Sequence, residues 1–208
     1  MRFRDVRPGP QGPPDPAEVL ELWYRAPLSL DLVKDGRDIA APKRRPFRHH
    51  FGHVRFRVRL PDRTDVLVEF NPDDDVTKAV TKVEKERRGS IPGTLTAQRW
   101  ETGYPGGGDD RNRRAPLVLS APQVDVLLDT LDAWFPEGPD SEVEDHARYH
   151  LMSSNCVTTL ADLYLGVLDR GGPLLPRQKR MRWAFATANS PATLWPRVRS
   201  TLRRWSEP

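Results

Sequence analysis

The sequence predicts an α+β fold in which a cysteine-bearing helix packs on an antiparallel β-sheet. Segments 53–60 and 65–72 alternate apolar and polar residues, as the two strands of a half-buried hairpin do. Segments 116–135 and 155–168 instead repeat apolar residues at helical spacing. We therefore expect strands and helices to form separate segments that meet around one apolar core.

Three parts of the chain differ in composition. Residues 1–16 are rich in proline and glycine, so we expect a disordered N-terminal tail. Residues 17–175 hold the periodic segments and are expected to form the folded domain, since a chain of 208 residues suits one domain. Residues 176–208 are basic and contain tryptophan, and we expect a helical extension that packs on this domain.

Local signals predict further elements before the cysteine. Asp15 as an N-cap followed by Pro16 predicts a short helix over residues 15–26. The stretch from Asp73 to Pro116 is polar, and a short helix is expected within it around segment 76–87. The glycine-rich segment 104–116 is expected to be a loop.

The second half of the chain has signals of the same kind. Ser120 is the expected N-cap of the helix within 116–135, and segment 136–145 is expected to be a loop. Pro196 is expected to confine the last helix to the residues that follow it, since proline breaks a helix interior. That helix either packs its tryptophans on the core or lies on a membrane surface.

The single cysteine and the lack of long apolar segments limit the class of protein. One cysteine, Cys156, excludes an intrachain disulfide framework. No segment has the apolar length of a signal peptide or of a membrane span. We expect a soluble protein that is cytoplasmic by default, with an exported effector as the alternative. The oligomeric state is not predicted.

Arginine-rich clusters give the chain a net charge of +4 and an isoelectric point of about 9.4. Such clusters attract phosphate, so one interpretation is peripheral association with an anionic membrane. The other interpretation is a solvated face without a ligand. No nucleic-acid-binding motif accompanies the clusters, and nucleic acid is therefore not an expected partner.

Cys156 is the candidate nucleophile. Ser154 or Asn155 can act as the N-cap of the helix, which puts Cys156 in its first turn. The unpaired N–H groups and the positive end of the helix favour a thiolate there and can hold an oxyanion. The alternative is that a lone cysteine on an apolar stripe is only a small buried hydrophobe.

His53 is the candidate base. Even-numbered residues of both predicted strands face the core, so His53, Glu69 and Asn71 share the opposite face. An amide or a carboxylate opposite a histidine fixes its tautomer. Asn71 is our first choice for this orienting residue, and Glu69 is the second. A histidine at the start of a strand can also have a purely structural role.

These residues carry a resemblance to a known family. The segments "HFGHVRFRV" and "YHLMSSNCVTTLADLYL" resemble the Lnb-type lipoprotein N-acyltransferases and their relatives, in which FGH precedes a strand and Y…NC opens a helix. More broadly, residues 47–169 resemble circularly permuted papain-like enzymes of the NlpC and lecithin:retinol acyltransferase kind. The resemblance implies a permuted papain-like fold with Cys156 as nucleophile and His53 as general base. Asn71 matches a third polar position by location only.

These features predict a cysteine-dependent hydrolase or acyltransferase that needs no cofactor. His53 deprotonates Cys156, which attacks an amide, ester or thioester carbonyl and forms an acyl-enzyme thioester. Asn155 and Glu69 are the expected contacts to the oxyanion or the substrate, beside the backbone N–H of Cys156. The expected partner is an acyl-group substrate such as a phospholipid or a peptide.

Two other functions fit the sequence. One is a non-enzymatic basic module that binds nucleic acid or anionic lipid. The other is metal binding, because His146 and His150 are four residues apart, which suits a pair of zinc ligands on one helix. No glutamate or further cysteine completes the pattern, so no metal site is predicted.

Overall fold

The computed structural model describes residues 1–25, 33–34, 37–38, 53–72, 91–100, 112–149 and 154–206. Its strands are β1 (Leu20–Arg25), β2 (Val33–Lys34), β3 (Arg37–Asp38), β4 (His53–Arg59), β5 (Asp65–Pro72), β6 (Ile91–Arg99), β7 (Asn112–Pro116) and β8 (Ser141–Tyr149). Its helices are the 3-10 turn η1 (Pro16–Glu18), α2 (Ala121–Trp134), α3 (Cys156–Arg170), α4 (Pro176–Ala186) and α5 (Pro191–Ser206).

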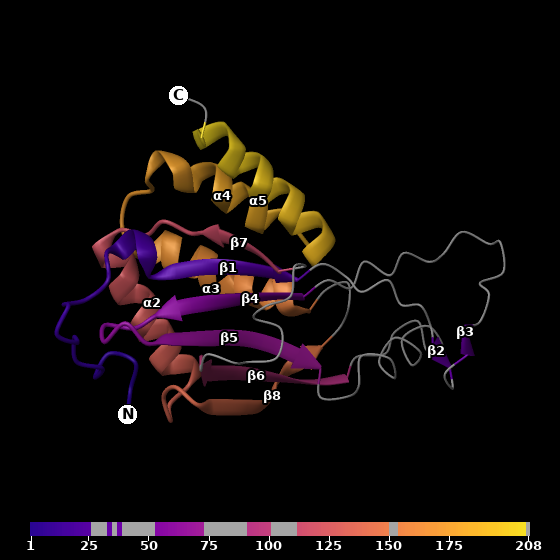
Figure 1. Cartoon of the computed structure of the whole chain (residues 1–208), viewed down its shortest axis with the longest axis horizontal. Coiled ribbons are helices and arrows are strands. Elements are labelled where there is room, and N and C mark those ends of the chain that lie inside the picture. The colour runs from indigo at the N-terminus through magenta and orange to yellow at the C-terminus, as the bar shows by residue number, and fades with distance from the viewer. Residues whose placement is uncertain are drawn as a thin grey trace.

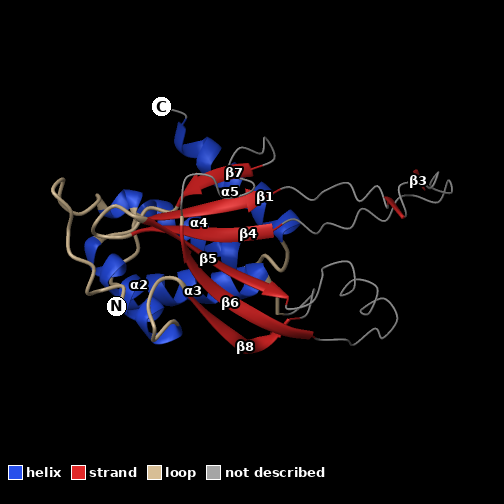
Figure 2. Ribbon diagram, turned by 60° about the horizontal axis from the view of Figure 1, so that its bottom comes forward, coloured by secondary structure: helices blue, strands red, loops and turns tan. Residues whose placement is uncertain are grey.

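One antiparallel sheet forms the centre of the molecule, with the strand order β7-β1-β4-β5-β6-β8. Helices α2 and α3 lie against one face of this sheet, and α4 and α5 continue that layer toward β7 (Figure 1, Figure 2). The protein is therefore α+β with an antiparallel sheet, as expected. The strands β2 and β3 pair with each other in a separate ladder.

The hairpin of β4 and β5 has the register that the alternation predicts. Phe56 pairs with Val68, and Val58 pairs with Val66, so even-numbered residues oppose even-numbered residues. All four side chains are fully buried. Because side chains alternate across a strand, the odd-numbered residues lie on the other face.

The apolar face of the hairpin meets the helical layer. The ring of Phe56 lies 6.5 Å from that of Tyr164 on α3, and Tyr164 lies 4.7 Å from Phe185 on α4. Trp195 on α5 stacks on Tyr24 of β1 at 5.2 Å, with the ring planes 3° apart. The C-terminal helices thus pack on the same core as the sheet.

The prediction of a helix over residues 15–26 is wrong beyond the first turn. Asp15 does cap η1, and its side chain accepts a hydrogen bond from the N–H of Ala17 at 2.8 Å. The chain then becomes β1, in which Leu20 and Leu22 alternate into the core while pairing with β4. Pairing on both sides of β1 overrides the local preference for a helix.

Two expected loops contain strands. The end of segment 104–116 is β7, and the second half of segment 136–145 belongs to β8. Both strands lie at the edges of the sheet, where polar side chains are common, so neither has a strong apolar alternation. Segment 76–87 lies outside the described residues. The expected helix with Ser120 as N-cap is confirmed as α2.

The N-terminal segment is packed rather than a disordered tail. Phe3 is fully buried, and its ring lies 6.1 Å from that of Phe135. Asp132 on α2 accepts a hydrogen bond from the N–H of Phe3 at 2.6 Å. Val6 is 5% exposed. A few apolar anchors are enough to order a proline-rich segment along the surface of a domain.

Pro196 lies inside α5 instead of starting it. Proline removes one N–H donor from the helix ladder, and the rest of the helix can persist if packing compensates. Leu194 and Val198 lie on either side of Pro196 in the chain and are fully buried. Their burial holds both halves of α5 on the core.

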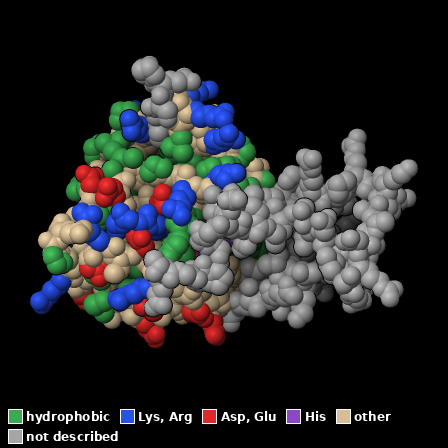
Figure 3. Space-filling view, viewed as in Figure 1, with side chains coloured by type: hydrophobic (Ala, Val, Ile, Leu, Met, Phe, Trp, Pro, Cys, Tyr) green, Lys and Arg blue, Asp and Glu red, His purple; other side chains and the backbone are tan. Residues whose placement is uncertain are grey.

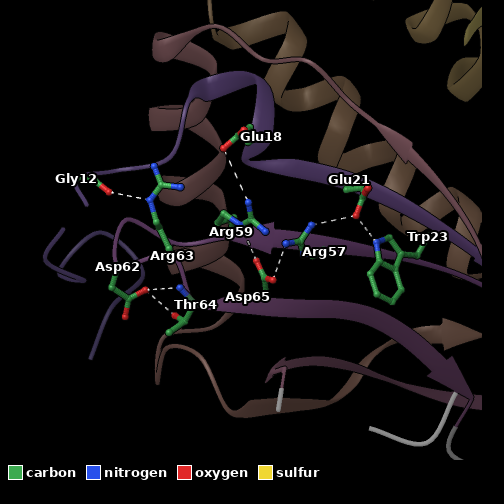
Figure 4. Close-up of polar contacts among 10 residues, drawn as sticks. All are labelled: Gly12, Glu18, Glu21, Trp23, Arg57, Arg59, Asp62, Arg63, Thr64 and Asp65. Atoms are coloured by element: carbon green, nitrogen blue, oxygen red, sulfur yellow. Dashed lines mark hydrogen bonds and ion pairs between the residues drawn. The ribbon is translucent and has the colours of Figure 1, made fainter. Parts of the chain in front are cut away.

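The polar face of the sheet carries connected ion pairs across β1, β4 and β5 (Figure 4). Arg57 donates to Glu21 at 3.2 Å and to Asp65 at 2.6 Å. Arg59 donates to the same Asp65 at 3.1 Å. Glu21 also accepts from the indole N–H of Trp23 at 2.6 Å. These two arginines of β4 are therefore balanced by carboxylates of the neighbouring strands.

Candidate active site

Cys156 is the first residue of α3, and the residue before it fixes the start of the helix. Asn155 is the N-cap, and its side-chain oxygen accepts from the N–H groups of Val157 at 2.8 Å and Thr158 at 3.3 Å. The Asn155 N–H in turn donates to the hydroxyl of Thr158 at 2.8 Å. This capping box satisfies donors that the helix leaves open, and it sets the position of Cys156.

His53 lies between Cys156 and Glu69. Its Nε2 donates to Oε2 of Glu69 at 2.9 Å, and the side chain of Cys156 lies close enough to the ring to help raise the pKa of His53. The start of β4, the end of β5 and the start of α3 thus meet at one point.

Glu69 is held by a second cation from β4. Arg55 donates to Oε1 of Glu69 at 3.2 Å, and the two residues are 7% and 8% exposed. The guanidinium of Arg55 lies 5.4 Å from the ring of Trp23, and that of Arg114 lies 4.2 Å from the same ring. Arg55, which donates to Glu69, is therefore itself held by a cation–π contact with Trp23.

The charges of this cluster depend on one another. Burial of the imidazole opposes its protonation, but the hydrogen bonds and charges of Cys156 and Glu69 outweigh it and raise the pKa of His53 to about 10. Burial likewise opposes ionisation of Glu69, but His53 and Arg55 lower its pKa to about 2. Both groups are charged at neutral pH. A cation beside a cysteine is the setting in which cysteines react as thiolates.

Tyr149, the last residue of β8, is a further group at the sulfur. Its hydroxyl lies close enough to the side chain and to the backbone N–H of Cys156 for both to affect the pKa of Tyr149. Burial, together with the charge of Cys156, raises the pKa of Tyr149, so the hydroxyl stays protonated at neutral pH. The ring of Tyr149 packs against Phe70, with the centroids 5.4 Å apart.

Access to the cluster is uneven. Cys156 is 1% exposed, whereas the side chain of His53 is 29% exposed. The sulfur is buried beside His53 and Tyr149 as well as beside the apolar core. A small electrophile that reaches the imidazole is therefore close to the sulfur.

The orienting residue differs from our first choice. Asn71 lies on the same face of β5 as Glu69, but among the described residues it is Glu69 that contacts the imidazole. The carboxylate is the stronger partner because its charge stabilises an imidazolium. Glu69 is therefore an orienting residue, and it faces His53 and Arg55 rather than an oxyanion position.

Asn155 does not have the oxyanion-binding position that we expected. Its amide oxygen caps α3, and its Nδ2 donates to the carbonyl of Asn189 at 2.9 Å. Asn155 is 2% exposed. With its amide engaged on both sides, this residue positions Cys156 and connects α3 to the start of α5.

Sequence reasoning did not place Tyr149 at the candidate site. The only signal was its place in the "Y…NC" pattern, seven residues before Cys156. Because residues 141–149 form a strand, His146 does not share a helix face with His150, which lies outside the described residues with His49 and His50. The described residues contain no cluster of three or more metal-ligating side chains.

Comparisons with protein-family models, curated proteins and solved structures found no match. Within the described part of the chain, none of the helices combines the length and the apolar character needed to cross a bilayer.

Proposed function

We propose that the protein is a cysteine-dependent hydrolase or acyltransferase that works through an acyl-enzyme thioester. The proposal depends on one observation, which is that His53 donates to the carboxylate of Glu69 at 2.9 Å while the side chain of Cys156 is near enough to raise the pKa of the same ring. A base between a nucleophile and an orienting acid is the arrangement that activates cysteine and serine nucleophiles on unrelated folds.

We also propose that the fold is a permuted papain-like one. Three features support this: the nucleophile opens a helix, the base lies on an antiparallel strand that this helix packs against, and the base precedes the nucleophile in the chain. The resemblance of residues 47–169 to permuted papain-like enzymes has the same order of histidine and cysteine.

In the proposed first step, the thiolate of Cys156 attacks a carbonyl carbon. An S–C bond forms, and the electrons of the C=O bond move to oxygen. The backbone N–H of Cys156 and the hydroxyl of Tyr149 donate hydrogen bonds to that oxyanion. When the intermediate collapses, the bond to the leaving group breaks, and the imidazolium of His53 gives its proton to the departing atom.

In the second step, His53 takes a proton from water, or from an acceptor amine or hydroxyl, as that group attacks the thioester. The C–S bond breaks, the acid or the acylated acceptor leaves, and the thiolate of Cys156 is restored. Glu69 stays ionised throughout and holds the imidazole in orientation.

Alkylation of Cys156 by iodoacetamide, followed by intact-protein mass spectrometry, tests the pairing. We expect fast alkylation of the wild type at neutral pH and roughly 30-fold slower alkylation of His53→Ala, since an unassisted cysteine is only a few per cent thiolate. The matched control is His146→Ala, which removes a histidine that packs on Phe70 and Trp134. Equal rates for His53→Ala and the wild type would contradict the proposal.

Acyl transfer is tested with p-nitrophenyl acetate. The wild type is expected to gain the mass of one acetyl group, and hydroxylamine should remove it, because thioesters react readily with that nucleophile. Both Cys156→Ser and His53→Ala should accumulate the adduct more slowly than the wild type. Acetylation that persists in Cys156→Ser would place the reactive group elsewhere.

A further inference from the structure

The C-terminal helices carry positive charge without negative charge. From residue 170 to residue 206 the chain contains no Asp or Glu. The basic residues of this stretch are Arg170, Arg177, Lys179, Arg180, Arg182, Arg197, Arg199, Arg203 and Arg204. Arg182 pairs with Asp169 of the preceding helix at 3.0 Å. This differs from β4, whose arginines are balanced by carboxylates on neighbouring strands.

A groove along α5 collects part of this charge. It has a volume of about 420 Å³ and is lined by Trp195, Pro196, Arg199, Ser200, Arg203 and Arg204. The three arginines are exposed, and none of them is paired with a carboxylate of the described chain. Figure 3 shows Lys and Arg side chains gathered over the upper part of the molecule, where α5 lies.

The lining of the groove is partly apolar. Trp195 is fixed by its stacking on Tyr24. Leu194 and Val198 point into the core and are fully buried, so the apolar side of α5 is already used by the fold. The outward side therefore offers guanidinium groups beside one indole ring. Arginine binds phosphate oxygens with paired N–H donors, and an indole suits the boundary between headgroups and acyl chains.

The groove is connected to the candidate active site. Asn189, just before α5, accepts the hydrogen bond from Asn155, the residue that caps the helix of Cys156. Tyr24, beneath Trp195, pairs in register with Val54, the neighbour of His53. One end of the groove is therefore fixed to the elements that position the nucleophile and the base.

We propose that α5 forms a docking groove for the headgroups of anionic phospholipids at a membrane surface. A phospholipid carries both a phosphate for the arginines and the acyl esters that a thiol acyltransferase or hydrolase attacks. The choice of phospholipid over other phosphate compounds rests on the proposed function. A nucleic acid fits less well, because the groove offers one aromatic ring rather than a series of stacking platforms.

Flotation with vesicles tests this surface. We expect the protein to bind phosphatidylcholine vesicles that contain about one third phosphatidylglycerol and not to bind vesicles of pure phosphatidylcholine. Added salt should release the bound protein, because salt screens the charges. Arg199→Gln/Arg203→Gln should weaken binding roughly 25-fold, since each basic residue near an anionic surface contributes about fivefold. The matched control, Arg2→Gln/Arg7→Gln, removes the same charge from exposed positions of the N-terminal segment and should change binding little.

Three results would overturn the inference: no binding to the anionic vesicles, equal losses in both double variants, or tighter binding to poly(U) than to vesicles. Cys156→Ser should bind vesicles like the wild type, so that a failure of the chemistry is distinguishable from a failure of docking. Iodoacetamide alkylation of Arg199→Gln/Arg203→Gln should equal that of the wild type, which would show that its fold and its site are intact.

Discussion

The Nε2 atom of His53 lies 2.9 Å from Oε2 of Glu69, and the other oxygen of the same carboxylate lies 3.2 Å from Arg55. One anion on β5 therefore holds two cations from β4, one that faces Cys156 and one that does not. Arg55 neutralises part of the carboxylate charge and also fixes its direction, so the imidazole receives an oriented partner. Such support is needed when a catalytic base must keep one ring orientation.

Glu69→Gln tests how much of the effect of Glu69 on His53 comes from its negative charge, because glutamine has nearly the same shape. The amide can still accept a hydrogen bond from Nε2, but it cannot stabilise an imidazolium by charge. We expect alkylation of Cys156 at neutral pH to slow by about 10-fold or more. Asn71→Ala is the matched control, because it changes the next residue on the same face of β5, and it should react like the wild type. If Asn71→Ala were the slower variant, our first choice of orienting residue would be restored.

The pKa of His53 is a direct measure of the cluster. NMR titration of the wild type should show an imidazole that remains protonated to about pH 10, because its contacts with Cys156 and Glu69 outweigh its burial. In Cys156→Ala the sulfur contact is lost while the burial persists, so the pKa of His53 should fall. A ring that titrates near 6.5 in both proteins would show that the contact has no electrostatic consequence.

The same shifts predict how stability depends on pH. The pKa of His53 is raised above 6.5, so its contribution to the free energy of unfolding is fully present below pH 6.5 and is lost as the pH rises through about 10. The pKa of Glu69 is lowered from 4.5, so its contribution is present above pH 4.5 and is lost as the pH falls toward about 2. Urea unfolding of Glu69→Gln should have a flatter acid limb than that of the wild type.

Much of this cluster followed from alternation and capping signals. The even-with-even register of β4 and β5 put His53 and Glu69 on one face, and the N-cap put Cys156 at the start of α3. These signals are local, because each depends on residues a few positions apart. The choice between Asn71 and Glu69 was not local, since it depended on the ion pair that Arg55 completes.

Other parts of the site could not be predicted because they depend on long-range packing. The strand β8 has little apolar alternation, and only its pairing with β6 makes it a strand and brings Tyr149 to Cys156. Asn155 looked free to bind an oxyanion, because the sequence does not show that its Nδ2 donates to Asn189. These two residues are 34 positions apart in the sequence. Contacts of that kind leave no periodic trace in a sequence.

Asn155→Ala should lower both stability and reactivity. Loss of the N-cap oxygen is expected to reduce the free energy of unfolding by about 1 kcal/mol, as removed N-caps commonly do. Alkylation of Cys156 should also slow, because the first turn of α3 is no longer fixed. Asn155→Ser keeps a capping oxygen but loses the donor to Asn189, so it should recover most of the stability. Urea unfolding of the three proteins measures the difference.

Gly93 on β6 should be intolerant of a side chain. A Cβ there would lie 2.5 Å from the ring of Phe70, which packs against Tyr149. We expect Gly93→Ala to lower the free energy of unfolding by about 1–3 kcal/mol, as overpacking in a core does. Gly166→Ala on α3 is the control with the opposite sign, because the nearest atom to its Cβ is 3.6 Å away and alanine favours a helix. Equal effects at both positions would contradict the close packing at Gly93.

Tyr149→Phe tests whether the hydroxyl acts on the oxyanion or on the sulfur. The substitution removes one oxygen and keeps the ring that packs on Phe70. If the hydroxyl donates to the oxyanion, the rate of acetylation by p-nitrophenyl acetate should fall by about 100-fold, the usual effect of losing one such donor. Iodoacetamide should react with Cys156 at nearly the wild-type rate, because alkylation forms no oxyanion. Equal losses in both reactions would instead assign the hydroxyl to the sulfur, and unchanged rates in both would exclude it from the chemistry.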